Sequence, residues 1–218
     1  MGNENDNYKP ILVTFAVKEE QKFFKSPEGV RVMLTGMGRD NAERAMDFVL
    51  EKFTPRLVLS CGFAGGLNPL LENEDIVFQA DEGTVLYQKL EESGARPISF
   101  FCARRVAITS EEKQKLWRGT GLDAVEMESE SIREICQEKN IPSATVRVIS
   151  DSAHEDLPLD FNTLMTPAQK IHVGKLSWAL VRSPWKLAEL LAFQQKTVTS
   201  AKALSAYLRK VLSAGIPL

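Results

Sequence analysis

The stretch LVLSCGFAGG, residues 57–66, indicates the fold class most directly. Residues 57–61 form a continuous apolar run, which is typical of a strand that is buried on both faces of a parallel sheet. The glycine-rich residues 62–66 then predict a loop at the carboxyl end of that strand. Because ligands of open α/β sheets bind at the carboxyl ends of strands, we expect a binding site here.

Strand-like and helix-like segments alternate on both sides of this stretch. We expect strands at residues 11–16, 30–35, 57–61, 75–80, 98–102, 106–108, 123–127 and 144–149, and helices from Asp40 to Pro55, from a cap at Ser110, and over 129–138. Residues 81–97 read as a surface hairpin or loop. The alternation predicts an α/β fold of three layers, α/β/α, with a central mixed, mostly parallel twisted sheet.

The last quarter of the chain has a different pattern. Residues 161–212 are almost wholly helical in pattern, with breaks at Pro167 and Pro184. We therefore expect one domain over residues 1–218, with a core at about 10–165 and a helical C-terminal extension at about 166–214.

Composition and charge exclude several classes of protein. The chain has 27 basic and 29 acidic side chains, so it offers no positive field for nucleic acid. Its apolar runs are far shorter than the roughly 18 residues of a membrane span. Residues 1–9 are polar and lack the apolar region of a signal peptide, so we expect a cytoplasmic protein. Three cysteines without metal-ligand spacing predict neither a disulfide framework nor a metal site.

Acidic side chains follow several of the expected strands. Glu19 and Glu20 follow the first strand, Glu126 and Glu128 follow the strand that begins at residue 123, and Asp151 follows the strand at 144–149. Since the carboxyl ends of parallel strands meet at one edge, these carboxylates should gather there. Such a gathering is unusual for a purely structural surface and predicts a site.

Four blocks in this order resemble one known family. They are TGMGRDNA at 35–42, GFAGGL at 62–67 with DIV at 75–77, AVEMES at 124–129, and VRVISD at 146–151. Each block alone is a weak motif, but their order and spacing are similar to those of the nucleoside phosphorylase and nucleosidase superfamily. Its members cleave the N-glycosidic bonds of purine nucleosides and of uridine. The resemblance also implies a homo-oligomer, with a dimer favoured.

The resemblance assigns roles to the last two blocks. It implies that Glu128 binds the ribose hydroxyls, that Met127 packs under the sugar, and that Glu126 supports them. Asp151 would protonate N7 of the departing purine, or hold a water that does so, and Ser150 would orient it. The plain structural alternatives are an acidic helix N-terminus for Glu128 and a turn cap for Ser150 and Asp151.

The segment FAVKEE, residues 15–20, bears on the nucleophile. Phosphorylases of the family usually carry Gly-Asp-Pro and a following arginine here, and another arginine where this chain has Ser60. The segment instead resembles that of the methylthioadenosine/adenosylhomocysteine nucleosidases. In those enzymes the last acid of an Ala-Met-Glu-Glu-Glu stretch activates water, which implies this role for Glu20. The alternative is that Glu20 merely opens an exposed helix.

Further contacts are expected around the same edge. The resemblance places Ala64 and Gly65 against the substrate, with Phe63 in place of a small hydroxyl residue so that its ring lines the pocket. Phe101 is the candidate for stacking on the base. An anion site at Gly36, Gly38 and Arg39 is the alternative that a phosphorylase would need, with inorganic phosphate as cosubstrate. We expect no cofactor.

The C-terminal extension is similar to that of hopanoid-associated members of the family, which release adenine from adenosylhopane. Leu157 and Pro158 lead into it. Its apolar side chains would pack in the core or a dimer, or alternatively form a wall for a lipidic substrate or a peripheral membrane contact: Trp178, Leu180, Val181, Trp185, Leu187, Leu190, Leu191 and Phe193. The sequence therefore predicts hydrolysis of an adenine-type nucleoside, either methylthioadenosine/adenosylhomocysteine-like or adenosylhopane-like. A phosphorylase and a noncatalytic nucleoside-binding protein are the alternatives.

Overall fold

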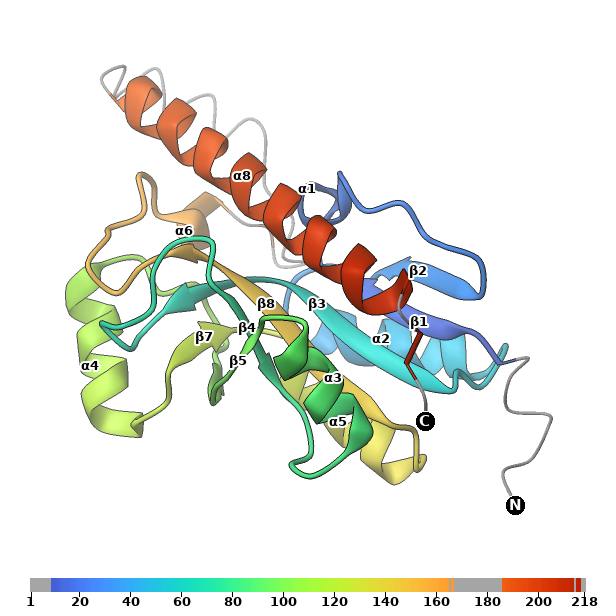
Figure 1. Ribbon diagram of the computed structural model, residues 1–218. Coiled ribbons are helices and arrows are strands. Elements are labelled where there is room, and N and C mark those ends of the chain that lie inside the picture. The colour runs from blue at the N-terminus through green and yellow to red at the C-terminus, as the bar shows by residue number, and fades with distance from the viewer. Residues whose placement is uncertain (1–8, 165, 167–185, 214, 217–218) are drawn as a thin grey trace.

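A computed structural model describes residues 9–164, 166, 186–213 and 215–216 (Figure 1). One eight-stranded sheet forms its centre, with the strand order β2-β1-β3-β8-β4-β5. Strand β7 also pairs with β3, and β6 pairs with β7. The strands are β1 (Ile11–Phe15), β2 (Val30–Leu34), β3 (Leu57–Gly66), β4 (Ile76–Gln79), β5 (Arg96–Pro97), β6 (Phe100–Cys102), β7 (Ala124–Glu126) and β8 (Ser143–Asp151).

The sheet is mixed and mostly parallel, as the sequence predicts. Strand β3 pairs in parallel with β1 and with β8, whereas the β3–β7 and β4–β8 pairs are antiparallel. Strand β1 accompanies β3 only as far as Ser60, and β7 takes over at Gly65 and Gly66. The far half of β3 therefore has a different neighbour from the near half, and the ends of β1, β3, β7 and β8 converge.

Helices cover both faces, which confirms the three-layer prediction. Leu57 and Leu59 of β3 pack in one core cluster with residues of α3 and α8, and Val58 packs in a second cluster with residues of α2 and α5. This alternation is the period-2 pattern of a strand buried on both faces. The helices are α1 (Lys18–Gln21), α2 (Arg39–Leu50), α3 (Val85–Glu92), α4 (Ser110–Thr120), α5 (Ser129–Glu138), α6 (Phe161–Leu164) and α8 (Lys186–Ser213).

The C-terminal helix α8 lies across one face of the sheet (Figure 1). Leu204, Leu208 and Val211 in its second half are fully buried, and the Tyr207 hydroxyl donates a hydrogen bond to the Leu90 carbonyl at 2.8 Å. In its first half, Leu187 and Leu191 are half exposed. The helix therefore completes the core with one half and extends beyond it with the other. Four of the apolar residues named above, Trp178, Leu180, Val181 and Trp185, lie outside the described residues.

Two predicted loops are wrong. Residues 62–66 continue β3 instead of forming a loop, because β8 and β7 provide hydrogen-bonding partners as far as Gly66. Within residues 81–97, helix α3 replaces the predicted hairpin or loop. The Thr84 hydroxyl caps this helix by accepting from the Tyr87 N–H, and its Leu86 and Leu90 face the core at helical spacing.

Two smaller predictions around α4 also fail. Residues 106–108 are not a strand, since the Val106 main chain bonds to the side chain of Asn162 rather than to a neighbouring strand. Thr109, rather than Ser110, caps α4, because its side chain accepts from the Glu112 N–H at 3.1 Å. Among the described helices, none is both long and apolar enough to cross a membrane.

The contrast within α8 gives a stability prediction. We expect Leu208→Ala to lower the free energy of unfolding by about 2–5 kcal/mol, because it removes a fully buried side chain from the core. Leu191→Ala, on the half-exposed part of the same helix, should change it by less than about 0.5 kcal/mol. Urea unfolding followed by circular dichroism measures both, and equal effects would contradict the packing described for α8.

Candidate active site

Glu20 is held against the middle of β3 by backbone groups. Its Oε2 accepts hydrogen bonds from the N–H groups of Ala16 at 2.8 Å and Val17 at 3.1 Å, and its Oε1 accepts from the Phe63 N–H at 2.8 Å. A Cβ on Gly62 would lie 2.5 Å from Oε1, so a side chain at that position would displace the carboxyl group. Glycine at this position therefore lets the Glu20 carboxyl lie directly against β3.

Burial governs the charge of Glu20. Its side chain is only 7% exposed, and this burial raises the pKa of the carboxyl, although the hydrogen bond from Phe63 and the charge of Arg147 act in the opposite direction. A buried carboxyl with a raised pKa is suited to accept a proton near neutral pH. The sequence-based alternative of an exposed helix start is wrong for this residue.

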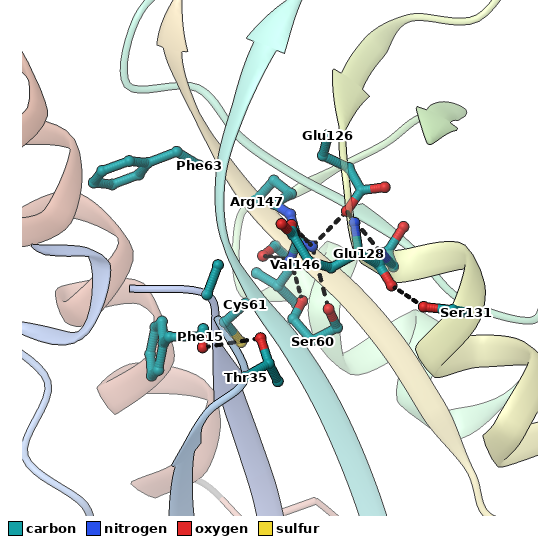
Figure 2. A network of polar contacts seen from close by, with 12 residues as sticks. Phe15, Thr35, Ser60, Cys61, Phe63, Glu126, Glu128, Ser131, Val146 and Arg147 are labelled. Carbon is teal, nitrogen blue, oxygen red and sulfur yellow. Dashed lines mark hydrogen bonds and ion pairs between the residues drawn. The ribbon is translucent and has the colours of Figure 1, made fainter. Parts of the chain in front are cut away.

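Arg147 lies at the centre of a buried polar network that the sequence analysis did not identify as functional (Figure 2). Its guanidinium donates to the Ser60 carbonyl at 2.6 Å, to the Ser60 Oγ at 3.2 Å and to Glu126 Oε2 at 2.7 Å. The same Glu126 oxygen accepts from the N–H groups of Glu128 and Ser129 at 3.0 and 2.7 Å. Burial opposes the ionisation of Glu126, but Arg147 and these N–H groups outweigh it and lower the pKa of Glu126.

Glu128 points from the start of α5 toward the turn before α2. Its Oε1 accepts from the Gly38 N–H at 2.7 Å, and its Oε2 lies 3.9 Å from the guanidinium of Arg147. Burial, and then the nearby charge of Glu126, raise the pKa of Glu128 to about 8. Since Glu20 also contributes to this shift, Glu20 and Glu128 lie within electrostatic reach of each other.

Asp151 is placed by a bulge in β8. Ala64 pairs with Ile149 but Gly65 pairs with Asp151, so Ser150 is the extra residue. The Ser150 hydroxyl donates to Asp151 Oδ1 at 2.6 Å, and the ammonium of Lys113 lies 2.5 Å from Asp151 Oδ2. The sequence analysis did not identify Lys113. In the sequence, Lys113 stands among the other charged residues of α4, and no sequence signal distinguishes it from them.

The predicted gathering of carboxylates is present. Glu20 abuts Gly62, and Asp151 abuts Gly65, three residues further along β3. At the rise of a strand, these two points of β3 are about 10 Å apart. Glu128 and Glu126 lie on the Glu20 side, linked to it through Arg147. Met127 is buried between these two glutamates in the chain, and Ala64 is buried between the two glycine contacts.

The side chains of Phe63 and Phe101 pack in different parts of the structure. The Phe63 ring packs with the core cluster on the α8 side and points away from Arg147 and Glu126 (Figure 2), so only its N–H contacts the carboxylate network. Phe101 packs against the cluster that contains Val125. Val125 and Asp151 both border Gly65, which places Phe101 on the Asp151 side of the site.

The glycine turn before α2 is occupied by protein groups. The Gly38 N–H donates to Glu128, and the Gly36 N–H donates to the Ala16 carbonyl. Arg39 turns outward, where its half-exposed guanidinium binds Glu43, Glu130 and Glu134. The structure therefore does not bring these residues together around a common anion position.

Two hollows differ in their relation to these groups. One of about 310 Å³ is lined by Asp151, by residues 155–158 and by one face of α8. A larger one of about 510 Å³ lies between β2 and α2 and contains none of the four carboxylates. The smaller hollow is the relevant one because it reaches Asp151. Across the described residues, no three His, Cys, Asp or Glu side chains are grouped as metal ligands.

A family model described as the phosphorylase superfamily matches residues 19–82 and 84–182. The chain belongs to this superfamily. The match begins just before Glu20 and includes the strands and turns that carry all four carboxylates. It confirms the family that the four sequence blocks indicate.

Curated relatives are similar to this chain in sequence, and solved structures share its fold. The 5′-methylthioadenosine/S-adenosylhomocysteine nucleosidase of Shewanella loihica is 24% identical over 177 residues, which are 65% of this chain and 77% of that protein. The protein of the same name from Anoxybacillus flavithermus is 26% identical over 71% of this chain and 82% of its own length. Helicobacter pylori futalosine hydrolase shares the fold at a TM-score of 0.68 with 15% identity, covering 95% of this chain and 99% of its own.

The raised pKa of Glu128 gives a prediction for stability against pH. The pKa of Glu128 is about 8 in the folded protein, whereas in the unfolded chain it has its ordinary value of 4.5. The protonated carboxyl therefore contributes its full stabilisation below the unfolded-state pKa, and this contribution is lost as the pH rises toward 8. Between pH 5 and 8, stability should therefore fall more steeply in the wild type than in Glu128→Gln, by up to about 1.4 kcal/mol per pH unit. Urea unfolding at several pH values measures both slopes, and parallel slopes would contradict the shift.

Proposed function

We propose that this protein hydrolyses the N-glycosidic bond of an adenine-type nucleoside and releases the base. The observation that carries the proposal is the position of buried Glu20 and Asp151 at two points of β3 about 10 Å apart. We place the sugar between these two points, with a group that activates water at one and a group that assists the leaving base at the other. The names of the curated relatives support the same chemistry.

Glu20 is the proposed general base. Its carboxyl is fixed by three backbone N–H groups, and burial raises its pKa, so it is oriented and ready to take a proton from water. The water oxygen then attacks the anomeric carbon as the bond to the base lengthens. The sugar at this stage resembles an oxocarbenium ion.

Glu128 is the proposed ligand of the ribose hydroxyls. A carboxyl group can engage two neighbouring hydroxyls at once. Glu128 Oε2, which lies 3.9 Å from the guanidinium of Arg147, is the oxygen proposed to accept from them. Glu126 orients this residue by accepting its N–H, and Met127 would pack under the sugar. Anchoring the sugar in this way lets binding energy act at the anomeric carbon.

Asp151 and Ser150 are proposed to serve the base. The bulge in β8 and the Ser150 hydroxyl orient Asp151, which reaches the hollow of about 310 Å³ beside α8. A proton delivered at N7 converts the purine into a better leaving group. Phe101 is on the same side and is proposed to stack on the base.

Water is favoured over phosphate as the nucleophile. Among the described residues, the arginines near the glutamate cluster are Arg147, which is bound to Ser60 and Glu126, and Arg39, which is paired outward with three glutamates. A phosphate dianion would need cations that these pairings withhold. A phosphorylase is therefore the second candidate, and a noncatalytic nucleoside-binding protein the third.

The proposal leaves three candidates for the group at the 5′ position of the nucleoside. Methylthioadenosine-like, adenosylhomocysteine-like and adenosylhopane-like nucleosides are the candidates. A cytoplasmic homodimer is part of the same proposal, by analogy with the family.

Base release from a panel of nucleosides tests the proposal. Methylthioadenosine, adenosylhomocysteine, adenosine, inosine and uridine are each incubated with the protein, with and without inorganic phosphate, and free base is measured by chromatography. Adenine release without phosphate is the expected result. Release only with phosphate, with ribose 1-phosphate as coproduct, would favour the phosphorylase. A melting-temperature shift without release would favour a binding protein.

Glu20→Gln tests whether Glu20 is the general base. We expect it to lower hydrolysis by about 10²-fold or more, because the amide cannot accept a proton from water. Glu19→Gln, at the exposed neighbouring position, is the matched control and should be close to wild type. If both variants hydrolyse the nucleoside at the wild-type rate, Glu20 is not the base.

Asp151→Asn tests the other end of the site. We expect base release to fall by about 10²-fold or more while binding of the nucleoside, measured by calorimetry, changes much less, because the ribose contacts lie elsewhere. Asp81→Asn, at an exposed position, serves as the control. Wild-type turnover in Asp151→Asn would remove Asp151 from the mechanism.

A further inference from the structure

Lys113 is a fully buried cation in α4. Its exposed fraction is 0%, although lysine is rarely buried unless it is paired. Its ammonium meets three oxygens: Asp151 Oδ2 at 2.5 Å, the Ser152 carbonyl at 2.8 Å and the Glu155 carbonyl at 2.9 Å. The three N–H groups of an ammonium are therefore all used, and α4 is bound to the turn that follows β8.

These three partners are chemically unequal. The two backbone carbonyls accept hydrogen bonds but are far too weakly basic to take a proton, whereas the Asp151 carboxylate can take one. After losing that proton, a neutral lysine amine still donates two hydrogens to the carbonyls and turns its lone pair toward Asp151. The geometry thus singles out one transferable proton and keeps the amine in place after the transfer.

Asp151 is arranged to pass a proton onward. Its Oδ1 is held by the Ser150 hydroxyl and its Oδ2 by Lys113, and Gly65 leaves only 3.1 Å between Oδ2 and the place of a Cβ. The carboxylate is therefore fixed on three sides, and it borders the hollow beside α8. Lys113 is therefore hydrogen-bonded, as a possible proton source, to the same carboxylate that borders this hollow.

We propose that Lys113 is a positioning residue for Asp151 and holds the proton that Asp151 passes to the departing base. The inference rests on the proposed function. As the bond between C1′ and N9 breaks, its electron pair stays on the base, and one proton passes from Lys113 through the Asp151 carboxylate to N7. Asp151 is then again a carboxylate, beside a neutral lysine amine. The water oxygen bonds to C1′ and gives a proton to Glu20. Glu20 then releases this proton to solvent, and Lys113 regains one, so that atoms and charges balance.

A purely structural Lys113 would only tie α4 to the turn at residues 152–155. The two roles differ in how they depend on the leaving group. Adenine needs a proton to leave, whereas 4-nitrophenolate leaves without one. A lost proton donor should therefore slow nucleoside cleavage selectively, whereas a distorted site should slow both reactions.

Lys113→Met tests this difference, with Lys115→Met on the exposed face of the same helix as the matched control. The substrates are methylthioadenosine and 4-nitrophenyl β-D-ribofuranoside, and the melting temperature is recorded for each variant. We expect Lys113→Met to lower adenine release by about 10²-fold or more and 4-nitrophenol release by less than about fivefold. Equal losses on both substrates would overturn the inference and leave the proposed function intact.

Lys113→Arg provides a second test that keeps the positive charge. A guanidinium retains hydrogen-bond donors but does not lose a proton in proteins. We expect this variant to be as slow as Lys113→Met in releasing adenine, and adenine release above about a tenth of the wild-type rate would overturn the inference. If neither variant folds, the wild-type rate is measured in mixtures of H₂O and D₂O. The proton from water to Glu20 moves with either substrate. A methylthioadenosine rate that requires two more moving hydrogens than the 4-nitrophenyl β-D-ribofuranoside rate therefore supports the relay, and a difference of only one contradicts it. Absence of base release by the wild type would instead reject the proposed function.

Discussion

The buried guanidinium of Arg147 is the interaction on which the site depends. It lies where β3, β7 and β8 meet, is nearly inaccessible to water, and binds Ser60 on one strand and Glu126 on another. A buried charge is costly unless it is paired and hydrogen-bonded, and the same holds for each glutamate around it. One cation thus makes it feasible to place Glu20, Glu126 and Glu128 close together in the interior.

The buried carboxyl groups of the site have different environments, and these environments shift their pKa values in different directions. Glu126 touches Arg147 and two backbone N–H groups, which lower its pKa and make it an anchor. Glu20 and Glu128 are less directly compensated, and burial raises the pKa of both. Asp151 has a separate cation, Lys113. Pairs of acids whose environments differ in this way are typical of acid–base chemistry.

Close backbone approach in β3 brings these groups together. Gly62 admits the Glu20 carboxyl, Gly65 admits that of Asp151, and the bulge at Ser150 aligns β8 for the second contact. A strand without side chains at these points can hold two carboxyls directly against its backbone. This geometry explains why a glycine-rich segment can belong to a sheet and still form part of a site.

The sequence by itself determined the α/β class, the bounds of α5 and the identity of the four carboxylates, because these follow from local periodicity and from blocks of adjacent residues. It could not determine that Phe63 points into the core, that Gly62–Gly66 stay in the sheet, or that Thr84 starts a helix. It also did not reveal the Arg147–Glu126 and Lys113–Asp151 pairs. These features depend on strand register, on one bulge and on contacts between segments far apart in the chain. Only the folded structure decides them, because a charged side chain becomes stable in the interior when its distant partner is already in place.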